Sequence, residues 1–186
     1  MTGISSQMKS IVTKLDSSLE QVAKVDKRVT SLETQQHTLA QYQRSHNLKI
    51  FGLHTTGTDQ VSIATQVYTA ILPILQIGVD KSGLTSVPGM LDVIDAAHPL
   101  PSKDKDKPIL HVRIKSKLIR ALILDNKKEY FKSSTVKFGI QEDICKPYLD
   151  LLLATRKRSD VLFAYYSNYK VKYKTKDSDK IHTASL

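Results

Sequence analysis

Apolar residues recur every three or four positions along the first 43 residues, with polar residues between them. If Met8 occupies heptad position a and Ile11 position d, nine of the eleven a and d positions from Ile4 to Leu39 are apolar. The stretch contains no proline, and its only glycine is Gly3. A 3.5-residue repeat held this long is typical of a left-handed coiled coil. Residues 1–43 are therefore predicted to form one long helix that associates through an apolar seam.

The number of helices in the coil is suggested by the residues that flank and interrupt the seam. Polar residues at Ser18, Gln36 and Gln43 favour a single register. Arg28 and Glu33 flank one core layer, in a pattern that resembles a trimer-specifying motif of coiled coils. We expect a parallel trimer, with a dimer as the alternative if this is an ordinary g–e′ pair. The residues predicted to mediate association are Met8, Ile11, Leu15, Val22, Val25, Arg28, Val29, Leu32, Glu33 and Leu39.

Beyond Arg44 the pattern changes to short alternating runs and one longer helical face. Strands are predicted at 47–53, 90–97, 108–114 and 136–140, and helices at 59–76 and 116–130. Pro73 is expected to kink or shorten the last turn of the first of these helices. The order βαββαβ is that of ferredoxin-like folds, which include the RNA-recognition motif (RRM). Residues 44–140 are therefore predicted to form an RRM-like domain.

The last 46 residues are predicted to form a small basic domain, 141–186. A helix is expected over 144–158, followed by a hairpin with strands at 161–166 and 169–174 around Ser167 and Asn168. Residues 175–186 are polar and are expected to be frayed. The overall fold class is α+β: a long coiled-coil helix, an RRM-like domain, and a helix-plus-hairpin domain.

The positive charge of the chain is concentrated in its last part. The formal net charge is +10, with 28 Lys and Arg against 18 Asp and Glu. Residues 100–186 carry 20 basic and 10 acidic side chains, whereas the two segments before them are nearly neutral. Such a distribution points to a polyanionic partner, with nucleic acid ahead of an anionic membrane surface.

Several classes of protein are excluded or disfavoured. A single cysteine, Cys145, rules out a disulfide scaffold and a cysteine-based zinc site, and the six histidines show no metal-ligand spacing. No run of 18 apolar residues is present, so no membrane span is expected. Nucleotide-binding and hydrolase motifs are absent. Asp92, Asp95 and His98 lie close in sequence without a partner constellation, so we expect no enzyme activity, no metal and no cofactor.

Basic residues alternate with apolar ones at the positions where phosphate contacts are expected. His111, Arg113 and Lys115 alternate with the predicted core residues of the third strand. Lys170, Lys172, Lys174 and Lys176 should all point to one side of the last strand. A solvated face is the simpler interpretation of each cluster, but their accumulation favours a nucleic-acid surface.

At this point the residues carry a resemblance that covers nearly the whole chain. The stretch from Tyr42 to Leu53 resembles the junction between coil and RRM in the first-open-reading-frame proteins of LINE-type retrotransposons. Residues 97–98 and 108–114 resemble that family's Ala-His and Ile-x-Val-Arg-Phe segments, and residues 117–121 resemble its basic second RRM helix. Residues 141–144 and 169–173 resemble its C-terminal domain. Each motif alone is weak evidence, and the resemblance depends on their common order and spacing.

The resemblance implies a homotrimeric protein that binds single-stranded RNA and acts as a nucleic-acid chaperone. It would coat its own transcript in a cytoplasmic ribonucleoprotein particle, with DNA as a second ligand and the nucleus as a second location. Arg44, Arg113, Arg120, Arg156 and Arg158 are carried over by position as RNA contacts. Charge and predicted exposure add further candidates, which are Lys49, Lys115, Lys117 and Lys172.

One departure concerns aromatic residues on the RRM sheet. An RRM stacks bases on aromatics of its first and third strands. The corresponding exposed positions here are Lys49, Ile109 and His111, while Phe51 is expected to pack. Binding led by phosphate contacts, with weak sequence preference and steep salt dependence, is therefore expected.

Two other classes remain open. The baculovirus few-polyhedra protein also joins a coil to an αβ body with a basic end, which would make this chain a viral or structural assembly protein. A coiled-coil scaffold that binds only proteins is the second, and a salt-dependent RNA shift would separate it from an RNA-binding protein.

Overall fold

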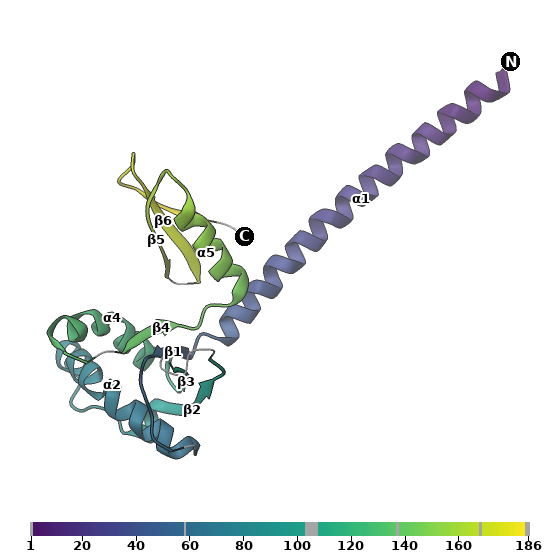
Figure 1. Ribbon diagram of the computed structural model, residues 1–186. Helices are drawn as coiled ribbons and strands as arrows, with labels where there is room; N and C mark the ends of the chain where they lie inside the picture. Colours follow the sequence, from purple (N-terminus) through teal and green to yellow (C-terminus); the bar gives the residue numbers. More distant parts are fainter. Residues whose placement is uncertain (1, 58, 103–107, 137, 168, 185–186) are drawn as a thin grey trace. The chain divides into compact units, whose positions relative to one another are not determined.

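A computed structural model describes residues 2–57, 59–102, 108–136, 138–167 and 169–184, with side chains from residue 7 onward (Figure 1). A long N-terminal helix is followed by strands and helices, which confirms the α+β class. The elements are α1 (Thr2–Gln43), β1 (Asn47–Phe51), α2 (Gln60–Ser82), α3 (Met90–Val93), β2 (Ile94–Leu100), β3 (Ile109–Ile114), α4 (Lys117–Ser133), β4 (Gly139–Glu142), α5 (Lys146–Lys157), β5 (Val161–Ser167), β6 (Lys170–Thr175) and β7 (Ile181–Ala184).

The chain divides into two compact units. We call Met1–Tyr42 together with Cys145–Leu186 the coil unit, and Gln43–Ile144 the central unit. Parts of the predictions lie outside the described residues: the seam side chain of Ile4, residue 137 of the fourth strand, Asn168 of the hairpin turn and residues 185–186.

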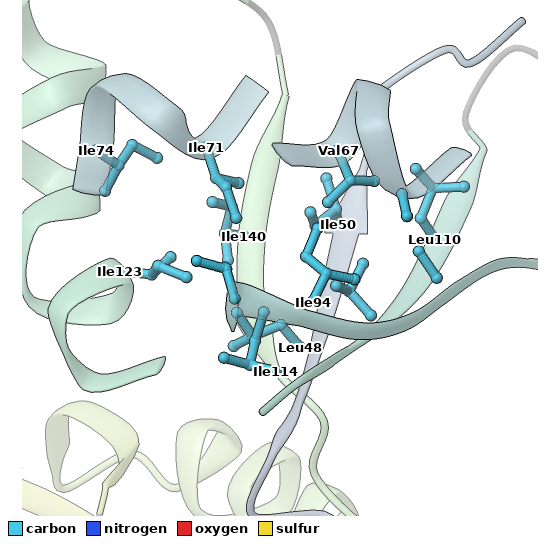
Figure 2. Packing of buried hydrophobic residues seen from close by; sticks show 14 of the residues in the cluster. Leu48, Ile50, Val67, Ile71, Ile74, Ile94, Leu110, Ile114, Ile123 and Ile140 are labelled. Atoms are coloured by element: carbon cyan, nitrogen blue, oxygen red, sulfur yellow. The ribbon is translucent and has the colours of Figure 1, made fainter. Parts of the chain in front are cut away.

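The central unit is a four-stranded sheet with the order β2-β3-β1-β4, in which every neighbouring pair is antiparallel. Side chains alternate across it, so Leu110, Val112 and Ile114 of β3 are buried as the pattern predicts. Figure 2 shows Ile71 of α2 and Ile123 of α4 beside the sheet residue Ile140. Helices α2 and α4 therefore cover one face of the sheet (Figure 1). The other face carries the polar side chains of the alternating strands.

Helix α2 is longer than predicted, because Pro73 does not end it. The Asp59 side chain caps its start by accepting a hydrogen bond from the Ser62 amide at 2.8 Å, and Gly83 ends it in the left-handed conformation at φ 70°. The proline removes one backbone hydrogen bond. Apolar residues continue to be buried beyond it, including Ile74 and Val79, and this packing offsets the loss.

Gly78 is a buried residue of α2. A β carbon at this position would lie 3.0 Å from Asn126 Nδ2 and 3.3 Å from Leu122 of α4, so glycine lets the two helices approach closely. By length and mean hydropathy, α2 is also the one helix in the described ranges that could cross a membrane. Eight of its residues are buried within the central unit, as in a core helix, and the absence of a membrane span stays a prediction.

The second predicted strand, 90–97, is wrong at both ends. Residues 90–93 form the short helix α3, and β2 runs from Ile94 to Leu100 and includes Pro99. Pro99 is tolerated because β2 is an edge strand, where a missing amide donor breaks no ladder. The fourth strand lies later than predicted, at Gly139–Glu142, because pairing with β1 turns Ile140 into the core.

In the coil unit, α5 packs on one face of a three-stranded antiparallel sheet with the order β5-β6-β7. Leu152 of α5, Ala164 of β5 and Val171 of β6 are buried. The expectation that 175–186 is frayed is wrong, because residues 181–184 form β7. This strand pairs with β6, and the His182 ring stacks on Tyr173 at 5.4 Å.

The end of α1 is tied to the start of α5 by hydrogen bonds. The Cys145 amide donates to Gln41 Oε1 at 2.8 Å, and this glutamine is only 1% exposed. The hydroxyls of Thr38 and Tyr148 lie 3.4 Å apart. A buried glutamine at the end of a heptad pattern thus serves the fold of the coil unit.

Candidate nucleic-acid interface

The seam of α1 stands open to solvent along its whole described length. Its apolar a and d residues are exposed by 46–65%: Met8, Ile11, Leu15, Val22, Val25, Val29, Leu32 and Leu39. Val12 and Leu19, at e positions of the same heptads, are also more than half exposed and widen the apolar stripe. Arg28 and Glu33 flank it and are exposed. A helix with such a stripe is stabilised by burying it against other helices.

The open face of the central sheet is organised around one buried carboxylate, Asp143. Lys49 Nζ lies 2.8 Å from its Oδ1, Arg44 Nη1 lies 3.1 Å from its Oδ2, and His111 Nε2 lies 3.4 Å from Oδ2. The Asn47 side chain adds a longer contact at 3.5 Å. The Asp143 side chain is only 2% exposed, whereas those of Arg44 and Lys49 are 43% and 29% exposed. Two of the predicted RNA contacts, Arg44 and Lys49, are therefore paired with a buried carboxylate of the protein itself.

The pKa values of this cluster follow from burial and pairing. Burial alone would raise the pKa of Asp143, but the hydrogen bond and charge of Lys49, followed by the charge of Arg44, hold it below the ordinary value. Burial lowers the pKa of His111, against the opposing attraction of Asp143. The His98 ring lies 5.0 Å from that of His111 and is tilted by 48°. The cluster is therefore an ionised carboxylate held by two cations, with imidazoles beside it.

The other predicted cations of the central unit do not share one face. Arg113 lies on the open face and pairs with Asp95 at 3.2 Å. Arg120 is on the helix side, where its Nη2 lies 2.7 Å from Glu142 and its side chain is 13% exposed. Lys115, between β3 and α4, and Lys117, the first residue of α4, are exposed. The structure thus separates Arg120 from the open-face cluster that contains Arg44 and Lys49.

The predicted contacts of the coil unit also divide between two faces. Arg156 Nε donates to the Ala164 carbonyl at 3.0 Å, which ties α5 to β5. Arg158 pairs with Asp160 at 2.6 Å and lies over the Tyr173 ring, 4.9 Å from its centre. Lys172 is on the opposite face of the sheet, because it neighbours the fully buried Val171 in β6.

That opposite face, turned away from α5, holds two functional candidates that the sequence reasoning missed. Phe163 and Tyr165 are 46% and 37% exposed, and their rings lie 6.1 Å apart. The register sets Tyr165 opposite Lys172 and Phe163 opposite Lys174. We call these four residues and Lys170 the aromatic–lysine face. Lys174 pairs with Asp179 at 2.6 Å, whereas Lys170 and Lys172 form no ion pair with any other described residue.

The signal for this face was present in the sequence but was obscured by a bulge. The pairing shifts between Val161 and Phe163, so strict alternation from the start of β5 assigns the wrong side to the aromatics. Counting back from the lysine stripe across the hairpin would have identified Phe163 and Tyr165.

Metal-ligating residue types do not gather in the ranges that the structure describes. No group of three His, Cys, Asp or Glu side chains there could hold a metal ion. Cys145 is buried. The expectation that the chain has no enzyme activity stays a prediction.

Comparison with known proteins adds no assignment. No protein-family model matches the chain, and no curated protein matches it. The interpretation therefore depends on the residues and the geometry described above.

Proposed function

We propose that this protein is a homotrimeric, single-stranded RNA-binding protein with nucleic-acid chaperone activity. Its ligand would be a retrotransposon transcript, which it would coat as a ribonucleoprotein particle. The sequence resemblance to the LINE-type proteins motivates the ligand. The exposed stripe on α1, the net charge of +10 and the aromatic–lysine face support the mode of binding.

Within this proposal the central unit is RRM-like and 141–186 contributes a basic C-terminal domain. The element order of the central unit, with α3 as an additional short helix, and the antiparallel strand order β2-β3-β1-β4 support the first part. The second part is supported by α5 packed on a small sheet whose other face is basic and aromatic.

Association as a parallel trimer is supported by the width of the apolar stripe. Residues at a, d and e positions are exposed together around Val12 and Leu19. A stripe wider than a two-residue seam is better covered by two partner helices than by one, and Arg28 and Glu33 are placed for a g–e′ pair between chains.

The observation that carries the RNA proposal is the pairing of Phe163 and Tyr165 with lysines on an open sheet face. Proteins that bind single strands stack bases on exposed aromatics and hold the backbone with cations. Phe163 and Tyr165 supply the rings, and Lys170 and Lys172 supply charge that no described carboxylate neutralises. The face therefore has both components of a single-strand platform.

The test is the Phe163→Ala/Tyr165→Ala variant of the full chain, with affinity for a labelled oligouridylate measured by fluorescence anisotropy. A stacked base is worth about 1–3 kcal/mol, so we expect affinity to fall by roughly tenfold or more. Leu84→Ala, which truncates a half-exposed side chain of the central unit, is the matched control and should bind as the parent does. Equal affinity of the double variant and the parent would reject this face as the RNA site.

A further inference from the structure

A groove of about 410 Å³ runs between α4 and the free edge of β4 in the central unit. Lys127, Lys128, Phe131 and Lys132 of α4 line one side, and residues 139–141 of β4 line the other. The groove is built from elements that contribute nothing to the aromatic–lysine face, which belongs to the coil unit. It is therefore a separate candidate site.

The groove brings three lysines together, and two of them, Lys128 and Lys132, form no ion pair with any described residue. Both are exposed and lie one helical turn apart. By contrast, Lys81 of α2 pairs with Glu129, an exposed carboxylate of α4 that is not among the residues lining the groove. Arg44 and Lys49 of the open sheet face share the Asp143 carboxylate, whereas Lys128 and Lys132 keep their charge available for a ligand.

The inner lysine decides which kind of ligand the groove suits. Lys127 Nζ donates to the Ile140 carbonyl at 2.7 Å, and burial lowers its pKa. A peptide strand added to the edge of β4 would need that carbonyl as an acceptor, and the lysine already occupies it, as in other protected sheet edges. A phosphate needs only donors, and the ammonium groups along the groove supply them.

We infer that this groove binds the phosphodiester backbone of a second segment of single-stranded RNA. The half-buried Phe131 ring forms part of the wall beside the sugars or bases. One protomer then holds two segments at once, one here and one at the aromatic–lysine face. Simultaneous contact with two segments raises their effective concentration, which is what strand annealing requires. This inference rests on the proposed RNA-binding function.

The test compares two charge-matched variants of the full chain. Lys128→Gln/Lys132→Gln removes the two outer groove lysines, and Lys24→Gln/Lys27→Gln removes two exposed lysines of α1 from positions outside the seam. The readouts are the salt dependence of oligouridylate binding, the rate of annealing of complementary oligonucleotides, and the reactivity of each lysine toward an amine-specific ester measured by mass spectrometry.

We expect RNA to protect Lys128 and Lys132 several-fold relative to Lys24 and Lys27. The groove variant should anneal strands several-fold more slowly than the control variant. Its salt slope should fall by about 1.4, because each phosphate contact to a single strand contributes about 0.7.

Three outcomes separate the explanations. If the parent binds RNA but the groove variant matches the control and its lysines stay unprotected, this inference fails while the proposed function stands. If the parent binds no RNA, the proposed function fails and this inference with it. If polyglutamate protects the groove lysines and RNA does not, the groove belongs to an acidic protein partner and the inference is overturned.

Discussion

On the open face of the central sheet, Arg44 and Lys49 converge on Asp143, and Arg113 pairs with Asp95. On the aromatic–lysine face of the coil unit, Lys170 and Lys172 have no carboxylate partner among the described residues. The sequence places several basic residues on each face. Only the second face has lysines, Lys170 and Lys172, that lack a carboxylate partner among the described residues and lie on the same face as exposed aromatic rings. We therefore expect a basic residue to contribute less to polyanion binding where the fold already pairs it with a carboxylate.

The largest effect should come from disrupting the proposed coil, because association of three chains would link their RNA sites. Val22→Asp/Val25→Asp places charge at adjacent a and d positions, and burying unpaired aspartates in a helical interface is strongly unfavourable. We expect a monomer in sedimentation velocity. We also expect roughly 100-fold weaker binding to a long single-stranded RNA, because linked sites gain effective concentration.

The control for the coil variant is Lys27→Asp, which introduces aspartate at an exposed position outside the seam. It should remain a trimer and bind as the parent does. A double variant that stays trimeric, or a monomer that binds long RNA as tightly as the parent, would contradict the proposed role of α1.

The second test removes the difference between the two faces by removing the buried carboxylate of Asp143. Asp143→Asn leaves Arg44 and Lys49 without their carboxylate, and losing such a buried partner costs about 1–3 kcal/mol of unfolding free energy in urea titrations. At low salt the same variant should bind RNA more tightly, because two cations become available. Lower or unchanged RNA affinity in a folded variant would show that compensation does not limit this face.

The pH dependence of this variant has a definite sign. Asp143 has a lowered pKa in the folded protein, so its ionised form stabilises the fold above the unfolded-state value of about 4. That contribution is lost as the pH falls through the folded pKa. The stability difference between parent and variant should therefore shrink in acid. Asp95→Asn, which removes a half-exposed carboxylate, is the control and should cost less than about 1 kcal/mol.

Arg120 offers a third test, because it was predicted to contact RNA and lies on the helix side of the sheet in an ion pair. Its guanidinium pairs with Glu142 and reaches the Asn47 carbonyl at 3.4 Å. Arg120→Gln should lower the unfolding free energy by about 1–2 kcal/mol and leave RNA affinity within twofold of the parent. Tenfold weaker binding with unchanged stability would return Arg120 to the RNA-binding surface.

The smallest expected effect comes from substituting one lysine on each of the two faces. Lys172→Gln should reduce the salt slope of RNA binding by about 0.7, as expected for one lost phosphate contact. Lys49→Gln should change the slope much less, since Asp143 already neutralises that lysine. Equal slopes for the two variants, measured by anisotropy across a salt series, would remove the distinction between the faces.

The sequence by itself determined the elements whose signal is local. The heptad pattern predicts α1, and the alternation of β3 correctly identifies its buried residues, because periodicity reports which side of an element is apolar. The α+β class follows from the same reading. Residues 90–93 and 181–184 were assigned wrongly because short helices and edge strands are decided by what they pack on or pair with.

Only the tertiary structure decided which charged side chains form ion pairs with each other. Nothing near Arg44 or Lys49 in the sequence shows that both would meet Asp143, which lies nearly 100 residues further along the chain. The continuation of α2 past Pro73 likewise depends on packing in the core. Local patterns fix which residues face solvent, whereas the partner of a charged side chain depends on which strands become neighbours. Strands that are distant in the sequence become neighbours only when the chain folds and the sheet pairs.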